Sequence, residues 1–489
     1  MYFFWRQVSR VAVATACVAL TLSAMPANSV AQLISIAALL NPEGSRLFPQ
    51  PVIYPRHPGK PDPRWKNFDW HYMDIRSNSS KYRLYFYTGE EWSAKFAIPK
   101  INDQMESLSK VFGYTPTQQF SYLLFTSLRE FRQANIFFIS EGVQGITSTR
   151  EATMAVPYWG QAESFEHVSK HELVHQFQVQ KMADLSGAFP EEVMAALPLW
   201  FVEGMAEYYS VPAGDEESRL FVRDLARNPK PEHDYKMPKF FEDGQLNFIN
   251  VYKVGQAKIA MLESKFGHGT VQRIFERCAR TFDGRSEKFA DIVATETGKS
   301  EEVIEKTWAD DVASAYLQQS DESITMAGSL VEVQAAGENL DLFDISPDGN
   351  MFALREIDPL SGVTSIRVMD LRFPENSREN SIEAIHDNKP GALSLYFMQM
   401  PTFAISNNMI AYIVETNEGP EIGIRKISRI AAGFSLGDEH RLKIHRSGIV
   451  QAQSLAIAPN ENKIAFVGLG NKGWANIFVI DIDAEGSVV

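Results

Sequence analysis

Cysteine is scarce in this sequence: Cys17 and Cys278 are the only two among 489 residues. Cys17 falls in an N-terminal segment that we expect to be removed, which would leave one thiol. One thiol cannot form an intramolecular disulfide, so we expect the fold to depend on its hydrophobic core alone. A single cysteine also gives no indication of a thiolate metal cluster. We expect Cys278 to pack as a small buried hydrophobic residue.

The sequence also lacks an excess of basic residues. Its 47 Lys and Arg residues against 61 Asp and Glu residues give a formal net charge of −14. This balance argues against a nucleic-acid partner, which would need a basic stripe. After the N-terminus no apolar run approaches the length of a bilayer crossing, so we expect no membrane span in the mature chain. A hydrophobic content of 45% is typical of globular proteins, and the chain length favours two domains.

Residues 1–31 have the pattern of a secretory signal peptide. Arg6 and Arg10 precede an apolar run at 11–22, and small residues follow up to Ala31. The alternative is an uncleaved N-terminal anchor. We predict an exported protein, either periplasmic or extracellular.

The composition changes along the rest of the chain. Residues 32–65 are rich in proline and indicate an extended lead-in. Residues 66–325 combine strand-like runs with helical periodicity, which predicts an α+β domain. We expect strands at Tyr82–Tyr87, Phe120–Thr126 and Ile136–Ile139, and helices at Ala97–Phe112, Ser164–Lys181, Glu191–Tyr209, Val251–Phe266, Gly269–Phe282 and Ser300–Leu317.

Residues 326–489 contain a pattern that occurs three times. Each copy has a short strand, a tight turn and a second strand, and a further strand follows it. The copies are Ile345–Leu354, Ile405–Ile413 and Ile457–Val467. Alignment on Ala353, Ala411 and Ala465 gives intervals of 58 and 54 residues, which is the scale of a four-stranded propeller blade.

This pattern resembles the TolB-like β-propeller repeat, which has a Ser-Pro-Asp-Gly turn before an apolar strand. Only the first copy, at Ser346–Gly349, keeps that turn. Three blades cannot close a ring, and an open propeller leaves sheet edges exposed, so we expect an incomplete propeller in a truncated chain. Such a domain could dock a protein partner. The alternative is a small β domain that is not a propeller.

His171-Glu172-Leu173-Val174-His175 is a His-Glu-x-x-His pattern within an expected helix free of proline and glycine. Residues four apart lie on one helical face, so both imidazoles can reach one ion, and the glutamate points toward the same open side. Such a pattern indicates a zinc site. A second expected helix downstream, at Leu199–Tyr209, offers a further carboxylate.

From about residue 66 to 320 the chain resembles the gluzincin metallopeptidases, in particular the peptidase-MA-like group related to aminopeptidase N. The third ligand of that family is the glutamate of a Trp-x-x-Glu-Gly-x-Ala helix, which matches Glu203 in Trp200–Ala206. The family's transition-state tyrosine lies in a Tyr-x-x-Gly segment, which matches Tyr252.

The resemblance implies zinc-dependent hydrolysis of a peptide or protein substrate, with one zinc ion per chain held by His171, His175 and Glu203. Three protein ligands leave a fourth position for water, which becomes more acidic on zinc. Glu172 would take the proton of that water and pass it to the leaving amine. Tyr252 would help to stabilise the oxyanion.

The chain departs from the family pattern in two ways. The 27 residues between His175 and Glu203 exceed the family spacing, which predicts an inserted loop around Ala183–Pro198. The family's Gly-Ala-Met-Glu-Asn segment, which recognises a free amino terminus, is absent. This absence favours an endopeptidase over an exopeptidase. An edge strand near Thr153–Val156 could bind an extended peptide by strand addition.

Several of these residues also have simpler interpretations. Glu207 is either an acceptor for a ligand histidine or a solvated helix residue. His167 is eight residues from His175, about 12 Å along a helix, so we expect a supporting or solvent-facing role. Tyr252 could be a packed helix-entry tyrosine. The three expected ligands could belong to a degenerate, metal-free relic.

Three functions remain open from the sequence. The first is a zinc peptidase with an appended propeller. The second is a propeller-based protein-binding module whose zinc domain is structural or inactive. The third keeps the hydrolytic chemistry but cleaves a bond other than a peptide bond.

Overall fold

A computed structural model describes residues 70–483 with gaps. The gaps are 78–80, 88–89, 127–130, 132–142, 149–151, 159, 161, 212–215, 230–235, 243–247, 283–286, 318–339, 358–363, 374–380, 387–401, 417, 431–432 and 471–474. The expected signal peptide at 1–31, the proline-rich segment at 32–65 and the expected strand at Ile136–Ile139 lie outside the described residues.

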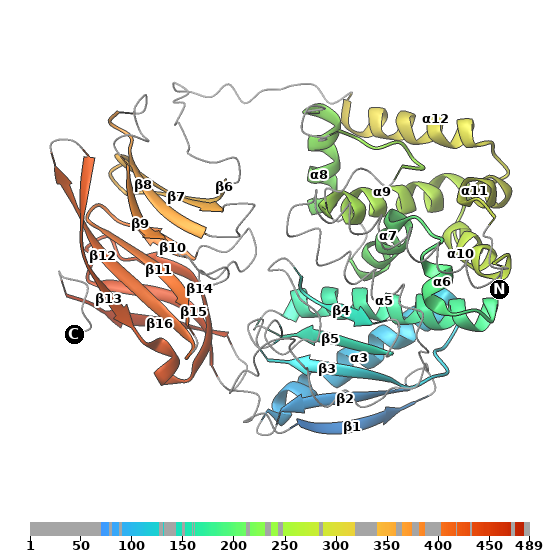
Figure 1. Cartoon of the computed structure of the whole chain (residues 1–489), viewed down its shortest axis with the longest axis horizontal. Helices are drawn as coiled ribbons and strands as arrows, with labels where there is room; N and C mark the ends of the chain where they lie inside the picture. Colours follow the sequence, from blue (N-terminus) through green and yellow to red (C-terminus); the bar gives the residue numbers. More distant parts are fainter. Residues whose placement is uncertain are drawn as a thin grey trace, which may run out of the picture.

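Residues 70–317 have the expected α+β organisation: a five-stranded mixed sheet followed by helices (Figure 1). The strands are β1 (Trp70–Arg76), β2 (Lys81–Tyr87), β3 (Phe120–Phe125), β4 (Ile146–Ser148) and β5 (Thr153–Pro157). Their order in the sheet is β1-β2-β3-β5-β4. β2, β3 and β5 are parallel, and β1 and β4 run antiparallel to their neighbours at the two edges.

Strand β5 lies inside this sheet, between β3 and β4, and all of its residues are buried. The expectation that Thr153–Val156 forms the edge is therefore wrong, because the edge strand is β4. β4 has only three residues, all half-buried. A strand that short shows no periodicity, so no sequence pattern indicated it.

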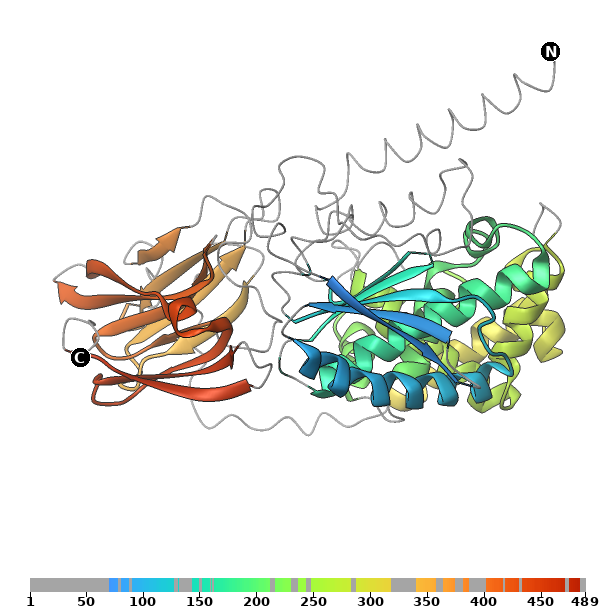
Figure 2. The ribbon, with the colours of Figure 1, turned by 90° about the horizontal axis from the view of Figure 1, so that it is seen from below.

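Two long helices, α3 (Glu91–Phe112) and α5 (Ala162–Ser186), pack against each other and against the sheet, and Figure 2 shows α3 running alongside the strands. α3 buries Ile101, Met105 and Leu108 at helical spacing. It ends at Gly113, whose left-handed conformation (φ 55°) is accessible to glycine without strain. α5 is longer than predicted and extends through part of the expected insertion.

The remaining helices follow in sequence. They are α6 (Pro190–Met194), α7 (Leu199–Ser210), α8 (Glu216–Arg227), α9 (Phe248–Phe266), α10 (Thr270–Arg280), α11 (Phe289–Thr297) and α12 (Glu301–Val312), which continues as a π-helical turn at Ala313–Leu317. The predicted helix at Glu191–Tyr209 is thus two helices, with Pro198 at the N-cap of the second. The expected inserted loop is largely helical. The hydroxyl of Ser300 accepts a hydrogen bond from the Val303 amide and begins α12 as predicted.

Three small antiparallel sheets form the second part of the described chain (Figure 1). The first is β6 (Leu340–Ile345), β7 (Met351–Ile357), β8 (Thr364–Asp370) and β9 (Ile382–His386); the second is β10 (Phe403–Ile405), β11 (Met409–Glu415), β12 (Pro420–Ile430) and β13 (Gly433–Leu442); the third is β14 (Ile449–Ile457), β15 (Lys463–Gly470) and β16 (Ala475–Asp481). In each sheet the strands pair in chain order. The described strands do not form a closed ring of sheets.

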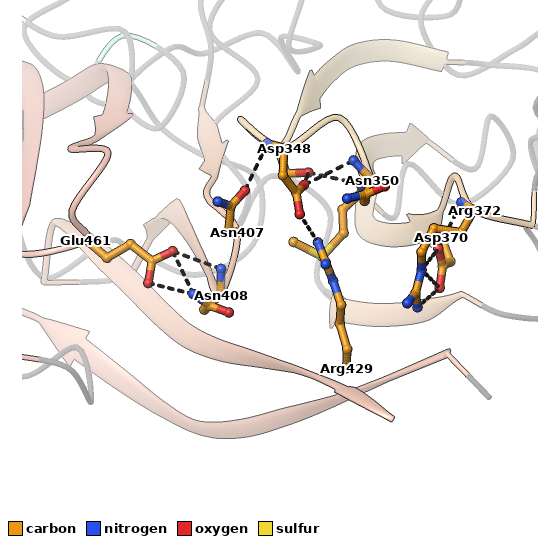
Figure 3. A network of polar contacts seen from close by, with 10 residues as sticks. Asp348, Asn350, Asp370, Arg372, Asn407, Asn408, Arg429 and Glu461 are labelled. Carbon is orange, nitrogen blue, oxygen red and sulfur yellow. Dashed lines mark hydrogen bonds and ion pairs between the residues drawn. The ribbon is translucent and has the colours of Figure 1, made fainter. Parts of the chain in front are cut away.

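The turns that precede β7, β11 and β15 are linked from one sheet to the next (Figure 3). In each link, a backbone amide of one turn donates to a side chain in the turn of the following sheet. The Asp348 amide donates to Asn407 Oδ1 at 3.0 Å, and the Asn408 amide donates to Glu461 Oε1 at 2.9 Å. Glu461 has a positive φ of 58°, in the position that Gly349 (φ 72°) takes in the first turn. A non-glycine residue is strained there, and the three hydrogen bonds that the Glu461 carboxylate accepts from Asn408 help to hold it in place.

Among the helices that the structure describes, none has the length and apolar character needed to cross a bilayer.

Candidate metal centre

Helix α5 carries the two histidines and helix α7 carries the carboxylate that the sequence singled out. His171 Nε2 and His175 Nε2 are 3.2 Å apart. Glu203 Oε2 lies 3.3 Å from His171 Nε2 and 3.2 Å from His175 Nε2. The three atoms therefore form a nearly equilateral triangle, although Glu203 follows His175 by a long gap in the sequence.

The dimensions of this triangle fit a tetrahedral zinc site. Ligand atoms about 2.0–2.2 Å from a tetrahedral zinc ion are roughly 3.3–3.6 Å from one another. The distances between the ligand atoms of His171, His175 and Glu203 are close to these values. Two imidazoles and a carboxylate are also a donor set that zinc prefers, so the residues present fit the ion.

The second nitrogen of each imidazole has its own acceptor. His171 Nδ1 lies 3.1 Å from Glu207 Oε1, and His175 Nδ1 lies 2.8 Å from Gln178 Oε1. Gln178 in turn donates through Nε2 to the carbonyl of Val202 on α7 at 3.0 Å. Because acceptors at Nδ1 hold the proton on that nitrogen, the lone pair of each Nε2 is directed into the triangle.

The carboxyl group of Glu172 is held from the edge of the sheet. Thr147 on β4 donates its hydroxyl to Glu172 Oε2 at 2.7 Å. Gly145 lies just before β4 and leaves room for the other oxygen, since a Cβ atom there would be 2.8 Å from Glu172 Oε1. The same Cβ would be 2.7 Å from Val168. β4 therefore fixes one oxygen of Glu172 and leaves space beside the other.

Helices α7 and α9 cross at two glycines, Gly204 directly after Glu203 and Gly255 three residues after Tyr252. A Cβ atom on Gly204 would lie 2.5 Å from the carbonyl carbon of Gly255, and one on Gly255 would lie 2.5 Å from the Trp200 carbonyl oxygen. This close approach places Tyr252 beside the site: its ring centroid is 5.7 Å from that of His171, at 30°. The glycines of the Glu-Gly and Tyr-x-x-Gly motifs are thus explained by packing, because a side chain at either position would clash with the backbone of the other helix.

Polar and charged side chains contact one another on the side of His171 that faces away from the triangle. His167 Nε2 is 3.4 Å from Glu207 Oε1, and Lys253 Nζ is 3.2 Å from Glu207 Oε2. Lys253 also pairs with Glu217 on α8 at 2.8 Å. His167 therefore lies behind the triangle, against Glu207, and does not face the triangle itself.

The two glutamates of the site have opposite pKa shifts. Burial raises the pKa of Glu203, but His175 and His171 outweigh it and lower the pKa to about 2. For Glu172 burial also raises the pKa, and the nearby histidines only partly offset it, so the net shift is upward. Glu203 is thus suited to bind a cation, and Glu172 is suited to accept and release a proton.

The same carboxylates act on the first histidine. Burial lowers the pKa of His171, but Glu203 and Glu207 outweigh that effect and raise it to about 10. The buried cluster therefore attracts positive charge, whether a proton or a metal ion.

The structure brings together all six residues proposed from the sequence: His171, Glu172, His175, Glu203, Glu207 and Tyr252. Sequence reasoning missed Thr147, Gly145, Gln178 and Lys253. Gln178 had a signal, because it follows His175 by three residues on the same helical face. Thr147 and Gly145 had none, since their contact with α5 depends on how β4 joins the sheet.

No protein-family model matches the sequence, and no curated protein matches it. Among solved structures, an M1 zinc metallopeptidase from Deinococcus radiodurans is 15% identical with a TM-score of 0.32, covering 49% of this chain and 51% of that one. Aminopeptidase A of Legionella pneumophila is 12% identical with a TM-score of 0.30, covering 63% and 32%. An aminopeptidase N family protein from Idiomarina loihiensis is 12% identical with a TM-score of 0.29, covering 64% and 66%.

This chain thus spans about half the length of the Deinococcus protein that it matches.

Proposed function

We propose that this protein is a zinc-dependent hydrolase of peptide bonds. The observation that carries the proposal is the convergence of His171 Nε2, His175 Nε2 and Glu203 Oε2 within 3.2–3.3 Å of one another, with the Glu172 carboxyl beside them. Zinc held by these three residues would supply a Lewis acid that makes water nucleophilic near neutral pH.

The other residues of the site have separate roles in this proposal. Glu172 takes a proton from the attacking water and passes it to the leaving amine, with Oε1 as the reacting oxygen because Thr147 occupies Oε2. Glu207 and Gln178 hold the imidazoles of His171 and His175 in orientation.

We infer that Tyr252 donates its hydroxyl to the developing oxyanion. Its ring lies against His171, which supports this role.

The substrate is proposed to be an extended peptide that adds to the outer side of β4. β4 is an edge strand of the described sheet, and its Thr147 contacts the proposed general base. The absence of the Gly-Ala-Met-Glu-Asn segment supports an endopeptidase, because in the family that this chain resembles that segment recognises the free amino terminus.

The remaining parts of the proposal concern the rest of the chain. The three small sheets are proposed to be blades of a β-propeller that docks a protein substrate or partner, because each is an antiparallel meander in chain order. The N-terminal sequence supports export to the periplasm or beyond the cell.

The test compares the wild type with Glu172→Gln in metal analysis and in a digest of a broad peptide mixture. We expect one zinc per chain in both proteins and a loss of hydrolysis of at least about a hundredfold in the variant. Glu166→Gln is the matched control, because Glu166 lies on the same helix and pairs with Lys100 away from the triangle.

Zinc binding without hydrolysis of any peptide by the wild type would overturn the proposal. It would favour a binding module with a structural zinc domain, in which His171→Ala unfolds the domain while Glu172→Gln changes nothing.

A further inference from the structure

The side chain of Lys253 lies between the candidate metal centre and helix α8. Lys253 belongs to α9, directly after Tyr252. Its Nζ atom is 3.2 Å from Glu207 Oε2 on α7 and 2.8 Å from Glu217 Oε2 on α8. The Glu207 side chain is 7% exposed, whereas that of Glu217 is 61% exposed. Lys253 therefore connects a buried carboxylate of the centre to a carboxylate at the surface.

Three basic side chains converge on the carboxylate of Glu207. Its Oε1 atom is 3.1 Å from His171 Nδ1 and 3.4 Å from His167 Nε2. Its Oε2 atom is the one that Lys253 contacts. The two histidines therefore share one oxygen of the carboxylate, and Lys253 holds the other.

This division matters because the carboxylate of a glutamate rotates easily about its Cγ–Cδ bond. His171 needs an acceptor at Nδ1 for its Nε2 to face the triangle. His167 competes for the same acceptor, since its Nε2 is buried and makes no hydrogen bond to the described residues. An ammonium group at Oε2 opposes rotation of the carboxylate toward His167, because hydrogen bonds between charged groups are short and strong.

The ammonium group of Lys253 is itself held in place from α8. Glu217 contacts its Nζ atom, and the neighbouring Ser218 donates its hydroxyl to Gln256 Oε1 on α9. Two successive residues of α8 therefore contact α9 beside Lys253. The backbone position of Lys253 and its contact with α8 together direct the side chain to Glu207.

We propose that Lys253 is a positioning residue of the metal centre: it fixes the Glu207 carboxylate, which then holds the ring of His171 toward the ligand triangle. This proposal rests on the zinc-dependent function proposed above. It also makes α8 part of the support of the centre, because Glu217 contacts the same ammonium group.

The positive charge of Lys253 has a second effect, which opposes the first. It repels a bound cation, so its removal would tighten zinc binding if charge alone counted. The Glu207 carboxylate lies between the ammonium group and His171, and Glu217 lies on its other side. Both carboxylates offset the repulsion, so the loss of positioning should outweigh the gain.

Zinc affinity of the full-length chain, measured by competition with a chelator, tests the proposal. Lys253→Met should lower it by about tenfold, and Lys253→Arg should largely restore it, because arginine keeps the donors and the charge. Glu217→Gln should change it by less than about twofold, since Glu217 is mostly exposed. Lys265→Met is the matched control, because Lys265 lies on the same helix and pairs with Asp311 away from the centre.

The cobalt(II)-loaded protein gives a measurement that charge repulsion alone would not change. Its visible absorption reports the geometry of the ligands. We expect Lys253→Met to alter the spectrum and Lys253→Arg to keep the wild-type bands. Lys253→Gln, which keeps a donor without the charge, gives the same comparison if the methionine variant does not fold.

Two failures can be told apart in these experiments. A wild type that binds zinc, with zinc affinity unchanged or higher in Lys253→Met, would overturn the positioning role alone, as would an unchanged cobalt spectrum. A wild type that binds no zinc would overturn the proposed function as well.

Discussion

Replacement of Gly204 by alanine tests how the candidate metal centre is assembled. The new Cβ would lie 2.5 Å from the carbonyl carbon and 2.8 Å from the Cα of Gly255, both backbone atoms that cannot rotate away. Ordinary contact between carbon atoms needs about 3.5–4.0 Å, so α7 and α9 must separate by about 1 Å. Glu203 is the residue before Gly204, so this movement would shift the third corner of the ligand triangle.

Two effects of opposite sign compete in this substitution. Alanine is a better helix former than glycine, which stabilises by about 0.5–1 kcal/mol. Overpacking of a close contact destabilises by about 1–3 kcal/mol. Because the clash is with backbone, we expect the second effect to win, with a net loss of about 1–2 kcal/mol and a zinc affinity lower by about 10–100-fold.

The assay is thermal unfolding of the zinc-free and zinc-loaded protein, with zinc affinity measured by competition with a chelator. Gly255→Ala should behave alike, since its Cβ would meet the Trp200 carbonyl oxygen at 2.5 Å. Ser264→Ala, at an exposed position of α9, is the control for helix propensity and should leave zinc affinity unchanged. A Gly204→Ala protein with higher stability and unaltered zinc affinity would refute the packing argument.

Three further predictions follow from other contacts. Gln178→Leu should weaken zinc binding by about 10–100-fold in chelator competition, because the ring of His175 loses its acceptor, while Gln178→Glu should largely restore it. Gly145→Ala should lower kcat with zinc content unchanged, because its Cβ would crowd Glu172 Oε1; unchanged kinetics would contradict this. Burial raises the pKa of Asp348, but bonds from Asn350, Arg429 and Ser346 outweigh it and hold the pKa below the ordinary value. The resulting stability is present above about pH 4 and is lost as the pH falls below it, so Asp348→Asn should flatten the acid limb of unfolding followed against pH.

The sequence predicted those features that depend on local spacing. His171 and His175 are four residues apart, so the helix alone brings their rings together. The helices at α5, α9, α10 and α12 agree with their predicted positions to within a few residues at most ends. The apolar period is clearest in α10. The three repeats agree with three separate sheets.

Features that depend on long-range packing could not be predicted in the same way. The position of Glu203 depends on the crossing of α7 and α9 and on an insertion that turned out to be helical. The edge of the sheet was predicted at Thr153–Val156 in β5, but the edge strand is β4. β4 pairs antiparallel with β5 over only three residues, which is too short to show a sequence pattern. The contact of Thr147 with Glu172 depends on the pairing of β4 with β5, so no local sequence pattern predicted it.

The two proposed functions of the site, holding a metal and moving a proton, have separate structural supports. Glu203 is placed by the glycine crossing of α7 and α9, whereas Glu172 is placed by β4 through Thr147 and Gly145. A change in the first support should therefore lower zinc affinity, and a change in the second should lower kcat at full zinc occupancy. The Gly204→Ala/Gly145→Ala double variant should show nearly the sum of the free-energy losses of the two single variants in zinc affinity and in kcat. The reason is that the two supports share no contact among the described residues. Strong coupling between them would show that His171, Glu172 and His175 move as one unit on α5, and that the two supports act through it.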